Sequence, residues 1–297
     1  MKKIFLPFIF LLVSLLSLSC SQKSNEGTIL VLLGSKIPYW QQIASGAEQQ
    51  GKALNLKMVT LYRDADTIRT SILNALNNLQ QYENLKGIVL FSGGDSLVEQ
   101  TIATVKPNVP IVAVDQVPAD NSPIKNMIRT SVVANNNGLG KGIASKVVEK
   151  QLVTLCYPIG GSLDRSLAIN DARGKDIIHK ILVSDAAAAA EKLKEYIENR
   201  EAGDYAVVFT TGSFINAETI KLLEGKKVYT VDMDSTIASY IRDGSIVFTA
   251  IPNTYEMGSK AVDLILGQED KLPTQYISVL YANKNNIDSP VIQQFLK

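Results

Sequence analysis

The chain has very little of the residue types on which most enzymes and metal proteins depend. Its 297 residues include only one histidine, His179, and two cysteines, Cys20 and Cys156. Two cysteines exclude a disulfide framework, and together with a single histidine they exclude a Cys/His zinc site. We therefore expect neither a metal nor a cofactor, and we interpret His179 and Cys156 as structural residues.

An excess of charge of one sign is also missing. Lysine and arginine number 30 against 29 acidic residues, so the net charge is +1, and no long block of like charge occurs. This balance gives no reason to expect nucleic acid or an acidic surface as a partner. The chain is 46% hydrophobic and 20% charged, which is typical of a globular protein, and it is long enough for two cores.

One long hydrophobic run stands at the N-terminus, in "MKKIFLPFIFLLVSLLSLSC". A basic start precedes an apolar stretch over 4–18, which is too short and too interrupted by proline for a comfortable membrane span, so we interpret 1–19 as a secretory signal peptide. The segment resembles a bacterial lipoprotein signal, which implies a lipid on Cys20, a polar tether over 20–27 and an anchored location outside the cytoplasm. Ser17 departs from the leucine preferred there, so an ordinary cleaved signal or an uncleaved anchor stays an alternative.

After Gly27, short apolar runs alternate with helical patterns. Candidate strands lie at 28–33, 56–61, 87–91, 110–114, 152–158, 205–210, 227–231 and 246–251. Candidate helices lie at 39–54, 66–83, 95–105, 137–150, 185–199, 214–223, 235–242 and 255–266. Continuous β-branched runs separated by helices indicate parallel strands that are buried on both faces. The pattern predicts doubly wound α/β architecture, and the length predicts two such sheets.

Polar and aromatic side chains follow the predicted strands at the ends where parallel sheets bind ligands. They include Lys36, Tyr39, Trp40, Ser92, Asp115, Asn137, Arg165, Asp232 and Asn253. Carboxylates and amides pair with sugar hydroxyls, arginine donates in a planar fork, and aromatic rings stack on sugar C–H faces. No histidine, cysteine or nucleophile with a partner base is among them. The set therefore favours binding of a small polar ligand, and we expect no enzymatic activity.

Several segments resemble the periplasmic sugar-binding proteins of ABC importers, of the ribose/galactose-binding type. They occur in order over about 28–280, and they are "IPYWQQIASGAEQQGKAL", "VPIVAVDQ", "NNNGLGKGIA", "YTVDMD", "IRDGSIVFTAIPNTYEMGSKAV" and "YISVLY". The resemblance implies two doubly wound parallel-sheet lobes, joined by a hinge of three crossovers near 134–137, 250–253 and 281–284. It divides the chain into an N-terminal lobe of 28–135 plus 253–282 and a C-terminal lobe of 136–252 plus 283–297.

The resemblance also assigns ligand contacts. It implies that Tyr39 and Trp40 sandwich a sugar ring, and that hydroxyls bind to Asp115, Asn137, Arg165 and Asp232. Lys36 and Ser92 stand where the family often has asparagine, and Asn253 lies beside Pro252, where glutamine is usual. Gly212 and Ser213 replace an Asn-Asp pair, and Arg173 competes with Arg165 for its role. These departures leave the identity of the ligand open.

Structural roles are the alternative for most of these residues. Trp40 falls on one helical stripe with Ile43 and Ala47, as a core residue would. Asp115 could form a turn, and one of the asparagines at 135–137 could cap the helix predicted over 137–150. Asp232 could cap the helix predicted over 235–242, although Asp234 or Ser235 is better placed for that role.

The sequence thus predicts an anchored, monomeric substrate-binding protein that delivers a monosaccharide to ABC permease subunits. A sensor that presents its ligand to a chemoreceptor or a histidine kinase is one alternative. The same fold with a nucleoside, a sugar acid or a furanose signal as ligand is another. A repressor of the lactose-repressor type shares this core, but it needs a DNA-binding helix-turn-helix where this chain has a secretory signal.

Overall fold

The computed structural model describes residues 26–63, 65–174, 177–199 and 204–296. The expected signal peptide over 1–19, Cys20 and most of the tether lie outside the described residues. Within the described part of the chain, no helix has both the length and the apolar character needed to cross a membrane.

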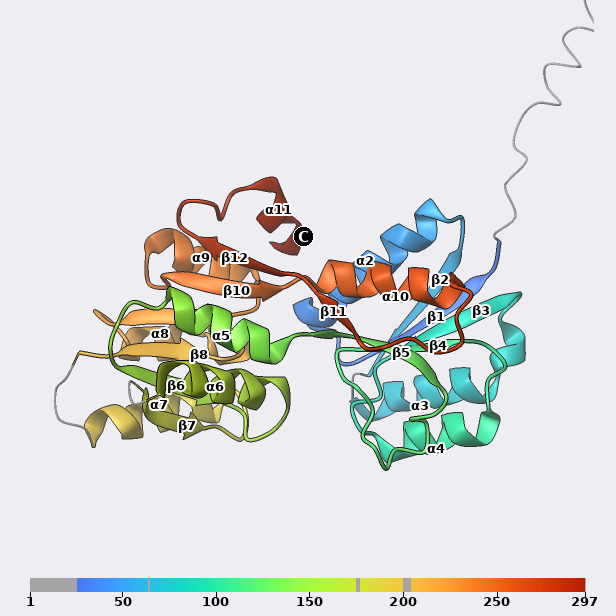
Figure 1. The fold of residues 1–297 in the computed structure, drawn as a ribbon, viewed down its shortest axis with the longest axis horizontal. Coiled ribbons are helices and arrows are strands. Elements are labelled where there is room, and N and C mark those ends of the chain that lie inside the picture. Colours follow the sequence, from blue (N-terminus) through green and yellow to red (C-terminus); the bar gives the residue numbers. More distant parts are fainter. Residues whose placement is uncertain (1–25, 64, 175–176, 200–203, 297) are drawn as a thin grey trace, which may run out of the picture.

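Two six-stranded sheets form the centres of two bodies that lie side by side (Figure 1). The first sheet contains β1 (Thr28–Leu33), β2 (Lys57–Tyr62), β3 (Leu85–Leu90), β4 (Ile111–Val114), β5 (Ile128–Ala134) and β11 (Gln275–Ile277). The second contains β6 (Leu152–Cys156), β7 (Ile177–Leu182), β8 (Ala206–Phe209), β9 (Lys227–Val231), β10 (Phe248–Pro252) and β12 (Val279–Asn283). The strand orders are β11-β5-β4-β3-β1-β2 and β12-β10-β9-β8-β6-β7, so the two sheets share one topology.

Helices cover both faces of each sheet. The first body, built on the first sheet, carries α2 (Pro38–Ala53), α3 (Ala65–Asn77), α4 (Ser96–Val105) and α10 (Thr254–Leu266). The second body carries α5 (Asn136–Lys146), α6 (Gly160–Arg173), α7 (Ala188–Glu198), α8 (Ala217–Leu222), α9 (Ser235–Asp243) and α11 (Pro290–Gln293). Short 3₁₀ turns add η1 (Leu79–Gln81), η3 (Gly212–Phe214) and η4 (Gln294–Leu296).

Strand β1 is apolar from Ile29 to Leu33 because helices cover both of its faces. Ile29, Val31 and Leu33 pack with residues of α2 and α10 on one face of the first sheet. Leu30 and Leu32 pack with residues of α3 and α4 on the other face. Successive side chains of a strand point to opposite faces, so a sheet covered on both sides needs apolar residues at every position. The predicted doubly wound α/β architecture is confirmed.

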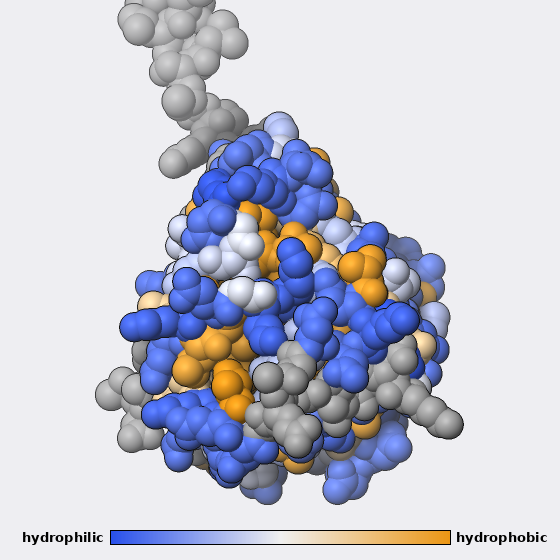
Figure 2. Space-filling view, turned by 90° about the vertical axis from the view of Figure 1, so that its left-hand side faces the viewer, coloured by the Kyte–Doolittle hydropathy of each residue, from blue (hydrophilic) through white to orange (hydrophobic). Residues whose placement is uncertain are grey.

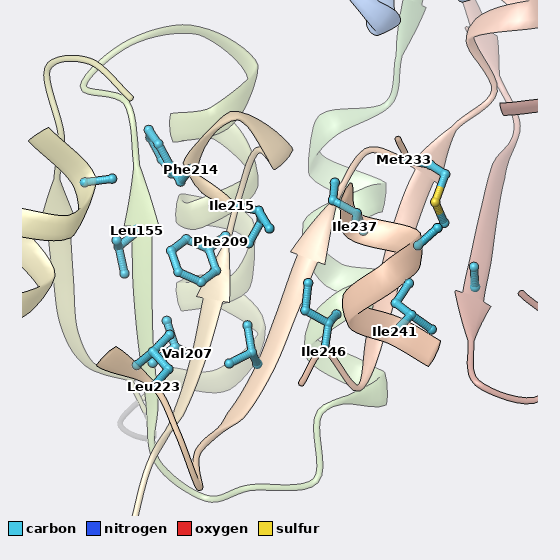
Figure 3. Close-up of a cluster of buried hydrophobic side chains, with 14 of the residues drawn as sticks. Leu155, Val207, Phe209, Phe214, Ile215, Leu223, Met233, Ile237, Ile241 and Ile246 are labelled. Atoms are coloured by element: carbon cyan, nitrogen blue, oxygen red, sulfur yellow. The ribbon is translucent and has the colours of Figure 1, made fainter. Parts of the chain in front are cut away.

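The second sheet has a core of the same kind. Phe209 and Val207 of β8 pack with Phe214 of η3 and with Ile237 and Ile241 of α9 (Figure 3). The end of the molecule formed by this body is covered mostly by hydrophilic residues, with only small separate hydrophobic areas (Figure 2). Such a surface is expected where a folded body faces water.

The strand ranges predicted from the sequence omit β5, β7, β11 and β12, and the predicted helix ranges omit α6 and α11. Strands β5 and β7 read "IRTSVVA" and "IIHKIL", and their polar residues break the apolar runs that mark the other strands. Helix α6 begins at Gly160, within a "GGS" stretch whose two glycines disfavour a helix. One further difference is that β12 pairs antiparallel with β10, in a sheet whose other described pairs are parallel.

Three segments connect the two bodies. The chain leaves the first sheet at the end of β5 and returns to the first body after β10. The third crossing lies at Ser278, between β11 and β12, and not at 281–284, because 279–283 pair with β10 in the second sheet. The lobe boundary expected at 282/283 therefore moves to Ser278, and the rest of the two-lobe division stays a prediction.

Candidate functional site

A cavity of about 550 Å³ lies between the two bodies. The first body contributes Tyr39 and Asp115 to its lining, and the second body contributes Arg165 and Asp232. Each of these side chains comes from a segment that follows a parallel strand, either from the loop itself or from the first turns of the next helix. The cavity thus occupies the place where open α/β sheets bind their ligands.

Asp115 and Asp232 occupy equivalent positions in the two bodies. Asp115 directly follows β4, Asp232 directly follows β9, and these are equivalent strands of the shared topology. Both have left-handed backbones, with φ of 67° and 72°. The Asp115 N–H donates to the Val132 carbonyl at 2.9 Å, and the Asp232 N–H donates to the Ala250 carbonyl at 3.0 Å. Aspartate tolerates this conformation better than most residues, so each strand can end sharply and turn a carboxylate into the cavity.

Tyr39 in the first turn of α2 donates its hydroxyl hydrogen to Oδ1 of Asp115. Burial raises the pKa of the Tyr39 hydroxyl well above its ordinary value of 10.0, and the charge of Asp115 raises it further. Burial also raises the pKa of the Asp115 carboxyl from its ordinary value of 3.8. The Tyr39 hydrogen bond and the charge of Arg165 oppose that rise, whereas the charge of Asp232 adds to it. The hydroxyl of Tyr39 therefore orients the Asp115 carboxylate before a ligand binds.

Arg165 in α6 is buried within the second body and oriented by two acceptors. Its Nε donates to Oδ1 of Asn136 at 2.9 Å, and its Nη1 donates to the Thr210 carbonyl at 2.8 Å. Arg173 donates instead to the carbonyls of Val147 and Glu149, just beyond the end of α5. Of the two candidate arginines, Arg165 lines the cavity, and Arg173 stabilises the end of a helix.

Asp232 is held by the short turn that follows β8. Its Oδ2 accepts from the Gly212 N–H at 2.9 Å and from Oγ1 of Thr211 at 3.3 Å. Gly212 packs closely, since a Cβ there would lie 2.8 Å from Cδ1 of Ile237 and 3.0 Å from the Val231 carbonyl oxygen. The lack of a side chain at Gly212 therefore lets this turn pack against Ile237 while its N–H binds the carboxylate.

Trp40 combines the two roles that the sequence left open. It belongs to the core between α2 and the first sheet, and it also lines the cavity. Its ring meets Tyr39 edge-on, with centroids 5.1 Å apart, and meets Phe91 at 4.2 Å. Only 8% of Trp40 is exposed, so most of its surface is committed to packing within the protein.

Four expected site residues lie outside the cavity lining, and we correct them here. Asn137 is exposed, because Asn135 caps α5 and the helix turns Asn136 toward Arg165. Ser92 donates to Glu99 at 2.8 Å, and Asn253 caps α10. Lys36 is exposed at the start of the turn before α2. Tyr39, Trp40, Asp115, Arg165 and Asp232 do meet in the cavity, and their contact with a ligand stays a prediction.

Several lining residues were missed by the sequence reasoning, and two of them had a usable signal. Gln42 and Ser162 lie three residues from Tyr39 and from Arg165 on the same helices, so they share a helical face with those side chains. Asn136 and Tyr157 had no such signal. The orientation of Asn136 depends on which of three consecutive asparagines caps the helix, and Tyr157 is placed by its hydrogen bond to Ser213 at 3.0 Å.

The charges in this cavity suit a neutral polar ligand. Its lining holds Asp115, Asp232 and Asp234 against one cation, Arg165, and Asp234 is committed to capping α9. Within the described ranges, no group of three or more His, Cys, Asp or Glu is placed to hold a metal ion. Carboxylates accept hydroxyl hydrogens and the guanidinium donates to hydroxyl oxygens, so together they can bind a compound that carries several hydroxyls.

Comparison with known proteins agrees with this arrangement. The family described as "Periplasmic binding protein domain" matches residues 29–271. No curated protein sequence matches the chain.

Similar folds occur among solved structures. A carbohydrate transporter solute-binding protein from Agrobacterium radiobacter, in complex with D-arabinose, is 19% identical, with a TM-score of 0.71 over 92% of this chain and 99% of that one. A solute-binding protein from Agrobacterium vitis, bound to α-D-tagatopyranose, is 16% identical, with a TM-score of 0.74 over 91% and 99%. A glucose-galactose binding protein from Geobacillus stearothermophilus is 18% identical, with a TM-score of 0.70 over 89% and 99%. At these identities the similarity establishes the fold.

Proposed function

The chain belongs to the periplasmic binding protein family, and from this premise we propose that it captures a monosaccharide between its two bodies for an ABC importer. It would act as a monomer outside the cytoplasm and hand its ligand to permease subunits. The family is one of binding proteins, and we propose that import needs no chemistry from this chain.

One observation carries the proposal, namely the convergence of Asp115, Asp232 and Arg165 on a single cavity. Each of the three is held by neighbours of its own body, so the groups are oriented before a ligand arrives. A site that is preorganised in this way loses less entropy on binding. Because Asp115 and Arg165 belong to different bodies, a ligand that touches both stabilises the arrangement in which the bodies are close.

The charge of the cavity favours a neutral sugar over a sugar acid. A carboxylate ligand would meet Asp115 and Asp232 and could pair only with Arg165. Lys36, which would have favoured an acidic ligand, lies outside the lining. Two of the compared proteins hold neutral monosaccharides, D-arabinose and α-D-tagatopyranose, in their solved structures. They support the same class of ligand for this chain.

We also propose that Cys20 carries a lipid that anchors the protein to a membrane surface. The support is the hydrophobic run that ends at this cysteine and the polar tether that follows it. Cys20→Ser should move the protein from the membrane fraction to the soluble fraction, with Cys156→Ser as the matched control that stays membrane-bound. Retention of the Cys20→Ser protein in the membrane would contradict lipid attachment at this residue.

A thermal-shift screen of the purified full-length protein tests the ligand class. The panel would contain pentoses, hexoses, sugar acids and nucleosides. A ligand present at a hundred times its dissociation constant adds about 2.7 kcal/mol of stability, which raises the unfolding midpoint by several degrees. Stabilisation by a neutral monosaccharide, lost in Asp115→Ala, is the expected result. Stabilisation by acids or nucleosides alone would overturn the proposal.

A further inference from the structure

Two large apolar side chains lie exposed in the lining of the cavity. Ile37 is 48% exposed and Ile159 is 77% exposed. They come from different bodies but from equivalent places, because each directly precedes the helix that follows the first strand of its body, α2 and α6 respectively. Their exposure places them at the mouth of the cavity, in contrast to the buried Trp40 and Arg165 that lie deeper.

Both isoleucines occupy positions where an apolar residue is unfavourable. Each is the N-cap of its helix, has an extended backbone and makes no side-chain capping hydrogen bond. Asparagine, aspartate and serine are preferred at such positions because they satisfy free N–H groups of the first turn. Asp95, Asn135, Asp234 and Asn253 do this for α4, α5, α9 and α10. Isoleucine at both mouth positions therefore needs a reason other than helix stability.

The lining contains further apolar residues. Pro38 adjoins Ile37, and the second body adds Met233, Ile237 and Ile251 to the lining. The polar groups that could bind a sugar lie among Asp115, Arg165 and Asp232. A free monosaccharide carries a hydroxyl on nearly every carbon, and a hydroxyl placed against an apolar wall loses water without gaining a hydrogen bond. The exposed apolar side chains of Ile37 and Ile159 thus offer no hydrogen-bonding partner to a sugar hydroxyl.

We propose that the ligand is a glycoside with an apolar group on its anomeric oxygen. This inference rests on the proposed function. The sugar ring lies where Asp115, Arg165 and Asp232 can bind its hydroxyls. The apolar group points toward the mouth and lies between Ile37 and Ile159. The cavity volume of about 550 Å³ falls within the range of about 300–1,000 Å³ that is usual for small-molecule sites.

Calorimetric titration of the full-length protein tests the inference. The probes are a free aldose that stabilises the protein and its methyl and phenyl glycosides, in both anomeric forms. We expect one phenyl glycoside to bind at least about tenfold more tightly than the aldose, since burial of apolar surface is favourable. Tenfold corresponds to about 1.4 kcal/mol.

The matched variants are Ile37→Ser and Ile159→Ser, separately and together. Serine is a favoured N-cap residue, so these variants are expected to fold. The double variant should lose the preference for the glycoside and keep its affinity for the aldose within about twofold, because the remaining contacts of the ring are unchanged. Val148→Ser, at a residue that is 83% exposed and does not line the cavity, should leave both affinities unaltered.

Four outcomes would overturn the inference. Equal binding of the aldose and its glycosides, or exclusion of the glycosides, would do so and would leave the proposed function intact. An equal loss of affinity for both ligands in the double variant would show instead that the isoleucines contact each other when the bodies close. Absence of binding by every aldose and every glycoside would overturn the proposed function and this inference together.

Discussion

The side-chain amide of Gln42 donates a 2.9 Å hydrogen bond to the main-chain carbonyl of Phe295, which joins α2 of the first body to the C-terminal turn of the second. The same Nε2 donates to the Met233 carbonyl at 3.2 Å, and Oε1 accepts from the Thr254 hydroxyl at 2.7 Å. Gln42 is buried and lines the cavity. One side chain therefore connects three segments that meet beside the site.

Gln42→Leu should destabilise the protein. The change leaves two carbonyls and the Thr254 hydroxyl without their partner, and an unsatisfied buried polar group costs about 1–3 kcal/mol. Urea unfolding would measure the loss. Gln50→Leu is the matched control on the same helix, where the side chain bonds Asp263 at an exposed position, and it should cost less than about 1 kcal/mol. Equal losses in the two variants would contradict the role of Gln42.

Asp115→Ala should weaken ligand binding by about ten- to a hundredfold. A hydrogen bond to a charged group contributes about 1.5–3 kcal/mol, and alanine also removes the acceptor that orients Tyr39. Calorimetry with the best ligand of the thermal-shift panel would measure the change. Asp120→Ala removes a carboxylate from a surface ion pair with Lys125 and should leave the affinity unchanged. Unaltered affinity in Asp115→Ala would remove this residue from the site.

Asp115→Asn should stabilise the ligand-free protein at neutral pH. The pKa of Asp115 is raised by burial, so the folded state holds its proton more tightly than the unfolded state does. Stability is lost as the pH rises from the ordinary pKa of 3.8 through the raised value, and asparagine avoids that loss. The advantage of the variant should therefore shrink as the pH falls toward 3.8.

Urea unfolding of both proteins across this pH range would test the prediction, with Asp120→Asn as the control. A variant that is less stable than the original protein at neutral pH would contradict it.

Arg165→Lys should weaken ligand binding, whereas Arg173→Lys should lower the stability of the protein. Lysine keeps the charge at 165 but cannot reproduce the planar pair of hydrogen bonds to Asn136 and Thr210, so affinity for the ligand should fall about tenfold. At 173 the arginine donates to the carbonyls of Ala144, Val147 and Glu149 near the end of α5, so stability should fall while affinity is retained. Affinity loss in Arg173→Lys alone would reverse the assignment.

Gly212→Ala should destabilise the protein by about 1–3 kcal/mol and weaken ligand binding. Its Cβ would meet Ile237 and the Val231 carbonyl oxygen at 3.0 Å or less, and relief of that contact displaces the N–H that holds Asp232. Gly267→Ala, where the nearest heavy atom to a Cβ lies at 3.4 Å, is the control and should be tolerated. Full stability of Gly212→Ala, measured by thermal unfolding, would show that this turn has room to adjust.

The sequence was informative wherever burial leaves a pattern. Residues 29–33 are all apolar because both faces of β1 are covered, and the predicted helix over 95–105 begins at Asp95, which is the N-cap of α4. The sequence pattern failed to predict strands β5 and β7, which contain polar residues, and helix α6, which begins with two glycines. Weak local propensity is overridden there by packing against neighbouring elements.

By itself the sequence determined the architecture, because the alternation of apolar runs and helices allows few folds other than two doubly wound sheets. It also determined that Asp115 and Asp232 each directly follow a strand. Only the tertiary structure decided which neighbours share the cavity. Asn136 lies there in place of Asn137 because Asn135 takes the cap, and Ile37 lies across the mouth from the second body's Ile159. Such choices depend on the direction of single side chains and on the approach of two bodies, and neither leaves a periodic signal in one chain.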